Sequence, residues 1–337
     1  MAIALGVAVL IDRAVIGTVI ALFLIVAPFE RLYPRRRQAI RRPLLGMDIA
    51  FALLSPVLNI VGLTAGVVIG VVSLGWLPGL LVRPVVDALP AVVMPFVAFV
   101  LFDLVSYWTH RFAHEVPFMW RFHAVHHSPE HMDWVSGFRL HPFDGVLIAP
   151  AFACVLAAGF EVEVAGVLAI AQVVLGLFFH ANVRVRWRVL DRIVATPEFH
   201  HWHHSCEADA IGHNYGPALP WWDLLFGTYF MPSHRSGRRP AEYGVDEPLP
   251  GDVIGQLSYP CRGVRSHLWL WRHPVLALRA LFAAVCNLSA DIVRSTRRPT
   301  HSIRRSTVPG SASTNSSLIG PAATPRPPRR PLPERTA

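Results

Sequence analysis

The chain has 337 residues, of which 53% are hydrophobic and only 16% are charged, with a formal net charge of +9. Ordinary soluble domains have about 25% charged residues, so this composition excludes that class and predicts a polytopic membrane protein. Residues 294–337 hold nine arginines against one glutamate, which leaves the remainder nearly neutral and argues against a nucleic-acid partner. The cysteines are far apart and indicate neither disulfides nor a thiolate metal site: Cys154, Cys206, Cys261 and Cys286.

The first ninety residues predict membrane segments around a basic loop. Residues 14–29 form an uncharged run without a preceding basic region, which favours a retained membrane segment over a cleaved signal peptide. The loop after it is rich in arginine and is expected to be cytoplasmic by the positive-inside rule. Its arginines are Arg31, Arg35, Arg36, Arg37, Arg41 and Arg42. Residues 49–72 are long enough to cross a hydrocarbon core of about 30 Å, and residues 91–102, continuing towards Trp108, bring the chain back.

Histidines are concentrated in the middle of the chain, where thirteen of the seventeen fall between His110 and His213. Three clusters have i, i+4 or i, i+3, i+4 spacing, which places each cluster on one face of a helix. They are His110 and His114, then His123, His126 and His127, and finally His200, His203 and His204. Eight imidazoles exceed the needs of one tetrahedral or octahedral ion, so the clusters predict two metal ions. The isolated histidines are expected to be ordinary polar groups: His234, His267, His273 and His301.

A hairpin pattern separates the second and third histidine clusters. Residues 145–160 and 164–179 form two apolar arms of sixteen residues on either side of Glu161 and Glu163. Each arm is short for a full span, so two crossings and a re-entrant hairpin both remain open, and either returns the chain to the same side. Backbone groups at membrane depth must bond internally, so the spans are helices. The predicted fold class is all-α, a polytopic helical membrane bundle with a cytoplasmic cap that carries the histidines.

We expect the chain to consist of four regions, residues 1–90, 91–232, 233–294 and 295–337. Residues 232–257 are rich in proline, glycine and charge and predict a surface loop. Trp269 and Trp271, followed by apolar residues 275–285, indicate either an amphipathic helix at the membrane interface or a buried helix. The last region is rich in serine, threonine, proline and arginine, and we expect it to be disordered.

The histidine clusters, in this order and with their flanking residues, resemble the fatty acid hydroxylase and sterol desaturase superfamily over about residues 91–230. The matching landmarks are HxxxH from His110, HxxHH from His123, Arg139 to Pro142, Phe179 to Asn182, HxxHH from His200, and Asn214 to Gly216 followed by Trp222 and Asp223. The resemblance implies an integral membrane enzyme with a non-haem di-iron centre. It adds His180, at the end of an apolar run, as a ninth ligand. His141, His201 and His213 are further candidates beside the metals or the substrate.

The expected chemistry follows from the metals and from their surroundings. Oxidation of an unactivated C–H bond needs a redox-active metal, which iron with O₂ supplies and zinc cannot. We therefore expect two iron ions, cycling between Fe²⁺ and Fe³⁺, that hydroxylate or desaturate a sterol-like, fatty acyl or isoprenoid lipid drawn from the bilayer. Carboxylates near the histidine clusters in the sequence are candidates to accept hydrogen bonds from the ligand histidines and so to orient them. They are Asp103, Asp133, Asp144, Glu198 and Asp223.

No motif for flavin, NAD or haem is present, so electrons are expected from a separate ferredoxin or cytochrome with its reductase. The composition favours a bacterial inner membrane, with the metal site on the cytoplasmic side. The alternative is a non-catalytic membrane protein that binds or transports metal. Transport favours ionisable residues at mid-depth in the spans, whereas here they gather at the span ends.

Overall fold

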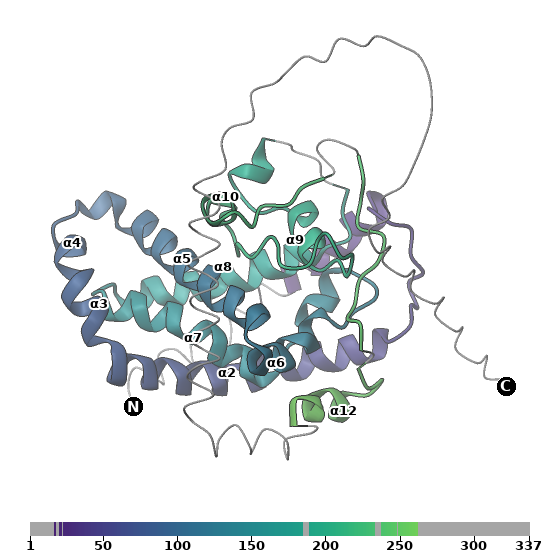
Figure 1. Ribbon diagram of the computed structural model, residues 1–337, viewed down its shortest axis with the longest axis horizontal. Helices are drawn as coiled ribbons and strands as arrows, with labels where there is room; N and C mark the ends of the chain where they lie inside the picture. Colours follow the sequence, from purple (N-terminus) through teal and green to yellow (C-terminus); the bar gives the residue numbers. More distant parts are fainter. Residues whose placement is uncertain are drawn as a thin grey trace, which may run out of the picture. The chain divides into compact units, whose positions relative to one another are not determined.

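The computed structural model describes residue 17 and residues 20–21, 23–184, 189–232, 237–247 and 249–261. Within these residues the regular structure is helical, with two isolated β-bridges and no strand, which confirms the predicted all-α class. They lie in one compact unit, Met1–Arg297 (Figure 1). The longer helices are α2 (Leu45–Leu74), α5 (Met94–Glu115), α6 (Pro117–His127), α7 (Pro142–Ala157) and α8 (Val162–His180). The short ones include α3 (Trp76–Leu81), α4 (Arg83–Asp87), η2 (Trp134–Phe138), α9 (Pro197–His203), α10 (Trp221–Phe226) and α12 (Val253–Ser258).

Three helical stretches are long and apolar enough to cross a membrane: Leu45–Leu74, Ala91–Glu115 and Val162–His180. The first two contain the predicted spans at 49–72 and 91–102, and the third contains the second arm of the predicted hairpin. The first arm forms α7, which has 16 residues and is shorter than the other three. The two arms of the hairpin therefore differ in length. α8 begins after Glu161, continues to His180 and is long enough to cross a membrane, whereas α7 is shorter.

Large aliphatic side chains line an uncovered face of α2. Leu53 is 73% exposed, Val61 67% and Val72 81%. A continuous apolar face of this kind is unusual on a protein surrounded by water and is typical of a surface that meets lipid acyl chains. α2 runs along the lower edge of Figure 1, α3 and α4 turn the chain at its left-hand end, and α5 returns beside α7.

α2 and α7 pack closely because small residues face each other along the whole contact. Gly62, Gly66 and Gly70 repeat every four residues on α2, and α7 presents Gly145, Ala149 and Ala153 at the same spacing. A Cβ atom added at Gly66 would lie 2.6 Å from the Cβ of Ala149, and one added at Gly70 would lie 2.9 Å from the Cβ of Ala153. Small residues at this spacing let helix backbones approach closely where no hydrophobic effect drives association.

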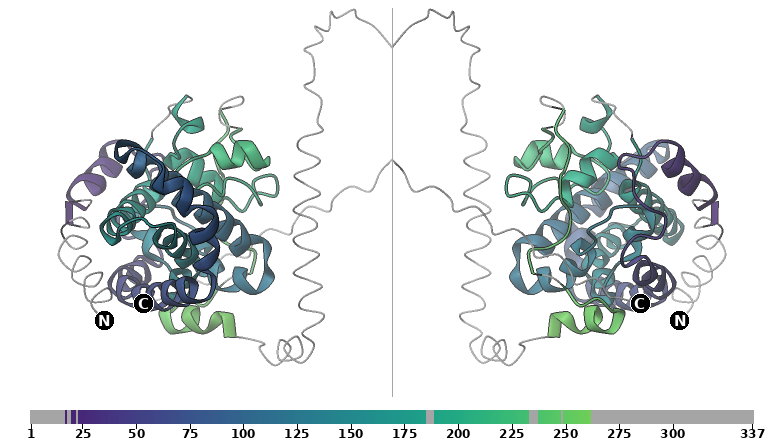
Figure 2. Two further views of the ribbon diagram at one scale, coloured as in Figure 1. Left: turned by 90° about the vertical axis from the view of Figure 1, so that its left-hand side faces the viewer. Right: turned by 90° about the vertical axis from the view of Figure 1, so that its right-hand side faces the viewer.

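The opposite side of α7 contributes to an apolar core shared with α5 and α8. Phe102 and Phe152 pack edge to face at 4.8 Å between ring centroids, and Leu168 of α8 joins them. In Figure 2 the blue helices of residues 45–115 lie against the teal helices of residues 142–180, in agreement with these contacts. This core holds the histidine-bearing ends of α5 and α8 at one end of the bundle.

Several expectations fall on residues outside the described part of the chain. Six residues of the predicted first segment, 14–29, lie there, and residues 23–32 are helical. The predicted interfacial helix with Trp269 and Trp271, and the predicted disordered tail from 295, lie there entirely.

The glycine contact predicts the effect of a single methyl group. Gly66→Ala should destabilise the protein by about 1–3 kcal/mol, because the new Cβ meets Ala149 and neither backbone can withdraw without losing other contacts. Adding Ala149→Gly removes the opposing methyl group and should restore stability. Thermal unfolding in detergent, followed by tryptophan fluorescence, measures both effects.

Gly46→Ala is the matched control, since Gly46 lies in the same helix with nothing within 4 Å of its added Cβ. It should leave stability unchanged or raise it by up to about 1 kcal/mol. Equal destabilisation by Gly46→Ala and Gly66→Ala would contradict close α2–α7 packing.

Candidate metal centre

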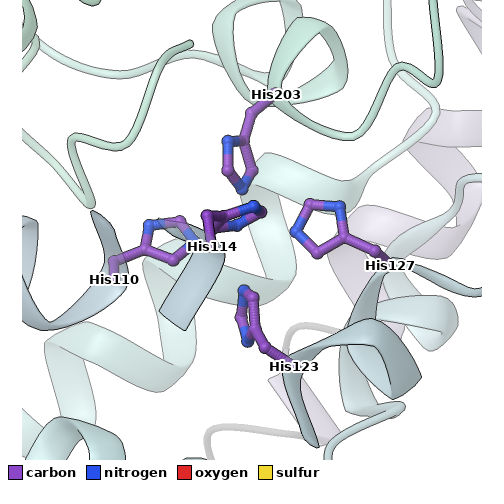
Figure 3. Close-up of side chains that lie close together, drawn as sticks. All are labelled: His110, His114, His123, His127 and His203. Carbon is purple, nitrogen blue, oxygen red and sulfur yellow. The ribbon is translucent and has the colours of Figure 1, made fainter. Parts of the chain in front are cut away.

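The nine histidines singled out from the sequence form two groups whose ring nitrogens converge. The first group is His110, His114, His123, His127 and His203, and the second is His126, His180, His200 and His204. Within each group the ligand atoms all lie within 4.8 Å of one another. Figure 3 shows the five rings of the first group pointing toward a common centre. The two groups are neighbours, since His127 of the first stacks on His204 of the second at 4.1 Å between ring centroids.

Four helices supply these rings, and prolines set where two of the helices begin. The first cluster lies on the last turns of α5, so the spanning helix itself delivers it. Val116 ends α5 in an extended conformation, because the following Pro117 disfavours α-helical geometry at the preceding residue, and Pro117 then starts α6. Thr196 caps α9 by accepting a hydrogen bond from the Phe199 amide at 3.3 Å, and Pro197 occupies the first turn.

The ring nitrogens of the first group fit a metal ion because four of them are buried without a hydrogen-bond partner in the part of the chain that the structure describes. These are the Nε2 atoms of His114, His123, His127 and His203. A buried polar atom without a partner costs free energy, and a ring of such atoms around one point is satisfied by a cation. In the second group, His200 Nε2 lies 3.3 Å from His180 Nε2 and 3.0 Å from His204 Nε2.

Five of the nine rings have Nδ1 bonded to a fixed acceptor. The acceptors are the Tyr215 carbonyl for His110 (2.8 Å), Asp144 Oδ1 for His123 (3.0 Å), the Arg139 carbonyl for His126 (3.3 Å), the Gly176 carbonyl for His180 (2.6 Å) and the His213 carbonyl for His203 (3.0 Å). A neutral imidazole that donates from Nδ1 keeps its lone pair on Nε2. The acceptors therefore select the tautomer that presents Nε2 to the centre of each group.

Burial favours the neutral form of His126, His127, His203 and His204. It lowers the pKa of His203 to about 3, and it lowers the pKa of His126, His127 and His204 well below the usual value. The neighbouring imidazoles act in the same direction, since two cationic rings would repel each other. Neutral imidazole is the form that coordinates a metal, so the protein holds these ligands in the required state at neutral pH.

Of the five candidate carboxylates, Asp144 alone contacts a ring of the two groups through a hydrogen bond that the structure describes. Its Oδ1 accepts from His123, and its Oδ2 accepts from the backbone amide of His141 at 2.8 Å. His141 in turn caps α7, where its Nδ1 accepts from the Phe143 amide, and its Nε2 donates to the Leu257 carbonyl at 3.1 Å. Both ring nitrogens of His141 are thus occupied outside the two groups, and its backbone amide contributes to the position of Asp144.

Asp223 and Asp103 accept hydrogen bonds from backbone amides of the loop whose Tyr215 carbonyl bonds His110. Asp223 accepts from the amides of Tyr215 (2.8 Å) and Gly216 (2.7 Å), and this fixes the Tyr215 carbonyl that receives His110. Asp103 accepts from the amides of Ala218 and Leu219 in the same loop, at 2.9 and 3.0 Å. The Asn214 to Gly216 and Trp222 to Asp223 landmarks therefore shape the loop behind the first histidine cluster.

Asp133 and Glu198 form ion pairs with arginines of the basic loop. Glu198 pairs with Arg35 at 3.0 Å, and Asp133 pairs with Arg42 at 2.6 Å. Arg42 also pairs at 2.6 Å with Asp48 of α2. This buried network of ion pairs also includes Arg139, which pairs with Asp48.

Arg139 supplies the acceptor for His126 and is itself held by the start of α2. Its Nε donates to Asp48 Oδ1 at 2.6 Å, and its Nη1 donates to Ser128 Oγ at 3.0 Å. Asp48 is fully buried between Arg42 and Arg139. Removal of one partner from such a network leaves a buried charge uncompensated, so the network fixes the Arg139 backbone against α2.

Two of the three further candidate histidines have structural positions that the sequence left open. His201 is 1% exposed, accepts or donates at Nδ1 with Tyr243 Oη (2.8 Å), and has Nε2 against the carbonyls of His180 and Ala181. Both of its nitrogens are therefore used outside the two groups. His213 contributes its backbone carbonyl to His203, while its own ring bonds the Ile211 carbonyl at 3.0 Å.

The acceptors are the part of the site that sequence reasoning missed. Four of the five are backbone carbonyls, which every residue possesses, so no residue type marks them. Gly137 had a weak signal, as a glycine between the second cluster and the hairpin. A Cβ there would lie 3.1 Å from the His180 ring, so a small residue lets η2 pack directly on this ligand.

The first group is the more open of the two on one side. His110 and His114 are half-buried, whereas His123, His127 and His203 are buried. Trp120 borders this side, with its ring 5.1 Å from that of His114 and 5.5 Å from that of His127 between centroids. An aromatic wall beside half-exposed ligands is suited to an apolar substrate group.

Comparison with known proteins identifies the same region. Residues 95–228 match the model of the fatty acid hydroxylase family. The ornithine lipid hydroxylase OlsE of Rhizobium tropici is 31% identical over 175 residues, covering 52% of each chain. The alkylglycerol monooxygenases of Danio rerio and Homo sapiens are 28% and 30% identical over 45% of this chain and 33% of their own.

This chain spans about half or less of the length of those relatives, and no solved structure matches it. The matched residues contain every histidine of the two groups and every one of the landmarks on which the resemblance was based. The resemblance is thus confirmed for residues 95–228, which are similar to the fatty acid hydroxylase family and to lipid hydroxylases and monooxygenases.

Proposed function

We propose that this protein is a membrane oxidoreductase that uses O₂ to oxidise a C–H bond of a lipid, with two iron ions held by the nine histidines. The observation that carries the proposal is the convergence of nine imidazoles in two adjacent groups at the ends of apolar helices. The family match and the lipid oxygenases among the relatives support the same chemistry. We assign His110, His114, His123, His127 and His203 to one iron and His126, His180, His200 and His204 to the other.

Iron is the metal that suits the proposed reaction. Bound iron would supply the redox chemistry with O₂ that a C–H bond requires, whereas zinc has none. The protein contributes the geometry. The Tyr215, Arg139, Gly176 and His213 carbonyls and Asp144 hold the rings with Nε2 toward the metals, and burial excludes water and keeps the ligands unprotonated.

The lipid is expected to enter beside the first group. In the first group, His110 and His114 are half-buried at the end of a spanning helix, and Trp120 would orient an acyl or alkyl chain against them. Relatives at 28–31% identity are named for the hydroxylation of ornithine lipid and for the oxygenation of alkylglycerol, and one at 27% is named as a putative sterol desaturase, so hydroxylation is the first expectation and desaturation the second. The two electrons of each turnover would come from a separate ferredoxin or cytochrome with its reductase.

A protein that only binds or transports metal fits the structure less well. Nine nitrogen ligands converge in two groups, five of the rings are oriented by fixed acceptors, and the relatives are enzymes. Transport needs a site that releases its ion to either side of the membrane.

Metal analysis of the purified protein tests the ligand assignment. His110→Ala and His203→Ala remove ligands of one group and His126→Ala removes a ligand of the other, so each should lower the iron content from about two per chain to about one or less and abolish activity. His213→Ala is the control, because its ring lies outside both groups and its carbonyl, which bonds His203, is retained. Full iron content in all three ligand variants would refute the assignment.

The reaction itself is tested with isotopic oxygen. Membranes that contain the protein, a reduced ferredoxin or cytochrome and ¹⁸O₂ should convert an endogenous lipid to a product with one ¹⁸O atom, because a hydroxylase transfers one oxygen to the substrate and one to water. A desaturase would instead remove two hydrogens and leave no label. Mass spectrometry of lipid extracts from wild-type and His126→Ala membranes makes the comparison. If no lipid differs while the wild type still binds iron, the oxygenase proposal fails.

Orientation is tested by thiol labelling. We propose an inner-membrane protein of a bacterium with the histidine groups on the cytoplasmic side, as the arginine-rich loop predicts. Cys206 is buried and a poor reporter, whereas Cys261 is exposed and follows α12, whose Leu257 carbonyl bonds His141 beside the first group. With the other cysteines replaced, Cys261 should react with an impermeant maleimide only after the cells are opened. Reaction in intact cells would reverse the orientation.

A further inference from the structure

The arginine-rich loop between helical residues 23–32 and α2 forms a pocket that the histidine centre does not use. This cavity, which we call the loop pocket, has a volume of about 370 Å³. Its wall includes Arg36, Arg37 and Gln38, and the same three residues line an adjoining cavity of about 340 Å³. Arg42 and Glu130 also line the loop pocket.

The charges around the loop pocket are not equally balanced. Arg42 is neutralised by ion pairs at 2.6 Å with Asp133 and with Asp48. Arg36 is held differently: its Nη2 donates to the carbonyls of Pro240 and Ala241, and its guanidinium lies 5.1 Å from the Tyr243 ring centroid. Carbonyl oxygens and an aromatic ring orient this cation without cancelling its charge.

Arg37 adds a second cation at the mouth of the loop pocket. Its side chain is exposed and forms no hydrogen bond, ion pair or ring contact with any residue of the described ranges. Glu130 is the one carboxylate among the residues that line this pocket, and it is exposed. An oriented guanidinium beside a free one is the arrangement that binds phosphate oxygens, through charge-assisted and bidentate hydrogen bonds.

The position of the loop pocket favours a lipid as the source of that phosphate. The loop joins the end of one apolar helical segment to the start of α2, which is long enough to span a membrane. The ends of spanning helices lie at the depth of the lipid headgroups, where basic pockets bind anionic lipids. We infer that the loop pocket binds a phosphate group, supplied by an anionic lipid headgroup or by free phosphate.

This site is distinct from the proposed metal centre. Of the residues that line the loop pocket, His201 is the one next to a metal-centre histidine in the chain, and both of its ring nitrogens are bonded within the protein. Phosphate binding can therefore be measured without iron, substrate or turnover, so its failure and the failure of the proposed oxygenase are separate results.

The experiment compares two arginines of the same loop. Arg37→Gln removes a pocket cation, and Arg41→Gln removes the same charge from an exposed residue that does not line the pocket. The purified full chain is placed in nanodiscs of phosphatidylcholine alone or mixed with phosphatidylglycerol, and in neutral detergent with added inorganic phosphate. Thermal unfolding by tryptophan fluorescence, as a function of the ligand concentration, gives the apparent affinity.

The wild type and Arg41→Gln should gain thermal stability from phosphatidylglycerol, and Arg37→Gln should need about tenfold more of it or not respond. The same pattern with inorganic phosphate in detergent would also support the site and would identify free phosphate as a sufficient ligand. Equal responses of all three proteins would show general attraction of a basic surface and would overturn the inference. The absence of any response in the wild type, with either ligand, would overturn it as well.

Discussion

The structure depends on one constraint: nine imidazoles must converge in two adjacent groups, most of them buried, with their ring nitrogens directed toward one another. Burial of polar atoms without partners costs free energy, and among the described residues the Nε2 atoms of His114, His123, His127 and His203 have no hydrogen-bond partner. The fold tolerates this cost only if the remaining interactions are strong enough to hold the rings in place. The arrangement around the histidines is therefore as much a part of the site as the ligands.

That arrangement is built mainly from the backbone. The carbonyl groups of Tyr215, Arg139 and Gly176 accept hydrogen bonds from Nδ1 of His110, His126 and His180, respectively. The first two carbonyls are each held in place by a different side-chain interaction. Asp223 holds the Tyr215 loop, and the buried pair of Asp48 and Arg139 holds the loop after α6. The Gly176 carbonyl needs no such support, because it lies one helical turn before His180 in α8. Residues far from the centre thus determine the orientation of its rings.

The apolar part of the molecule serves the same constraint at longer range. α5 and α8 carry their histidines at the ends of spanning helices, so any shift of the bundle would move the ligands. Close packing of glycine and alanine between α2 and α7 and the aromatic contact of Phe102 with Phe152 keep the bundle in register. The basic loop joins this bundle to the centre through Arg35 and Arg42, and leaves Arg36 and Arg37 for the loop pocket.

Sequence by itself determined the fold class, two of the spans and all nine histidines of the two groups. The spans and eight of the histidines depend on local properties, namely apolar runs of sufficient length and ligand spacing that matches a helical turn, whereas His180 was added by the family resemblance. The contact of Gly62, Gly66 and Gly70 with α7, which the structure shows, was not predicted from the sequence. Tertiary structure alone decided how the nine rings divide between two groups, because His126 and His127 are adjacent in the chain yet belong to different ones. It also decided that Asp144 bonds a ligand while Asp103 and Asp223 bond backbone amides. These assignments arise from contacts between residues distant in the chain, and carbonyl acceptors carry no residue signature, so spacing along the sequence contains no information about them.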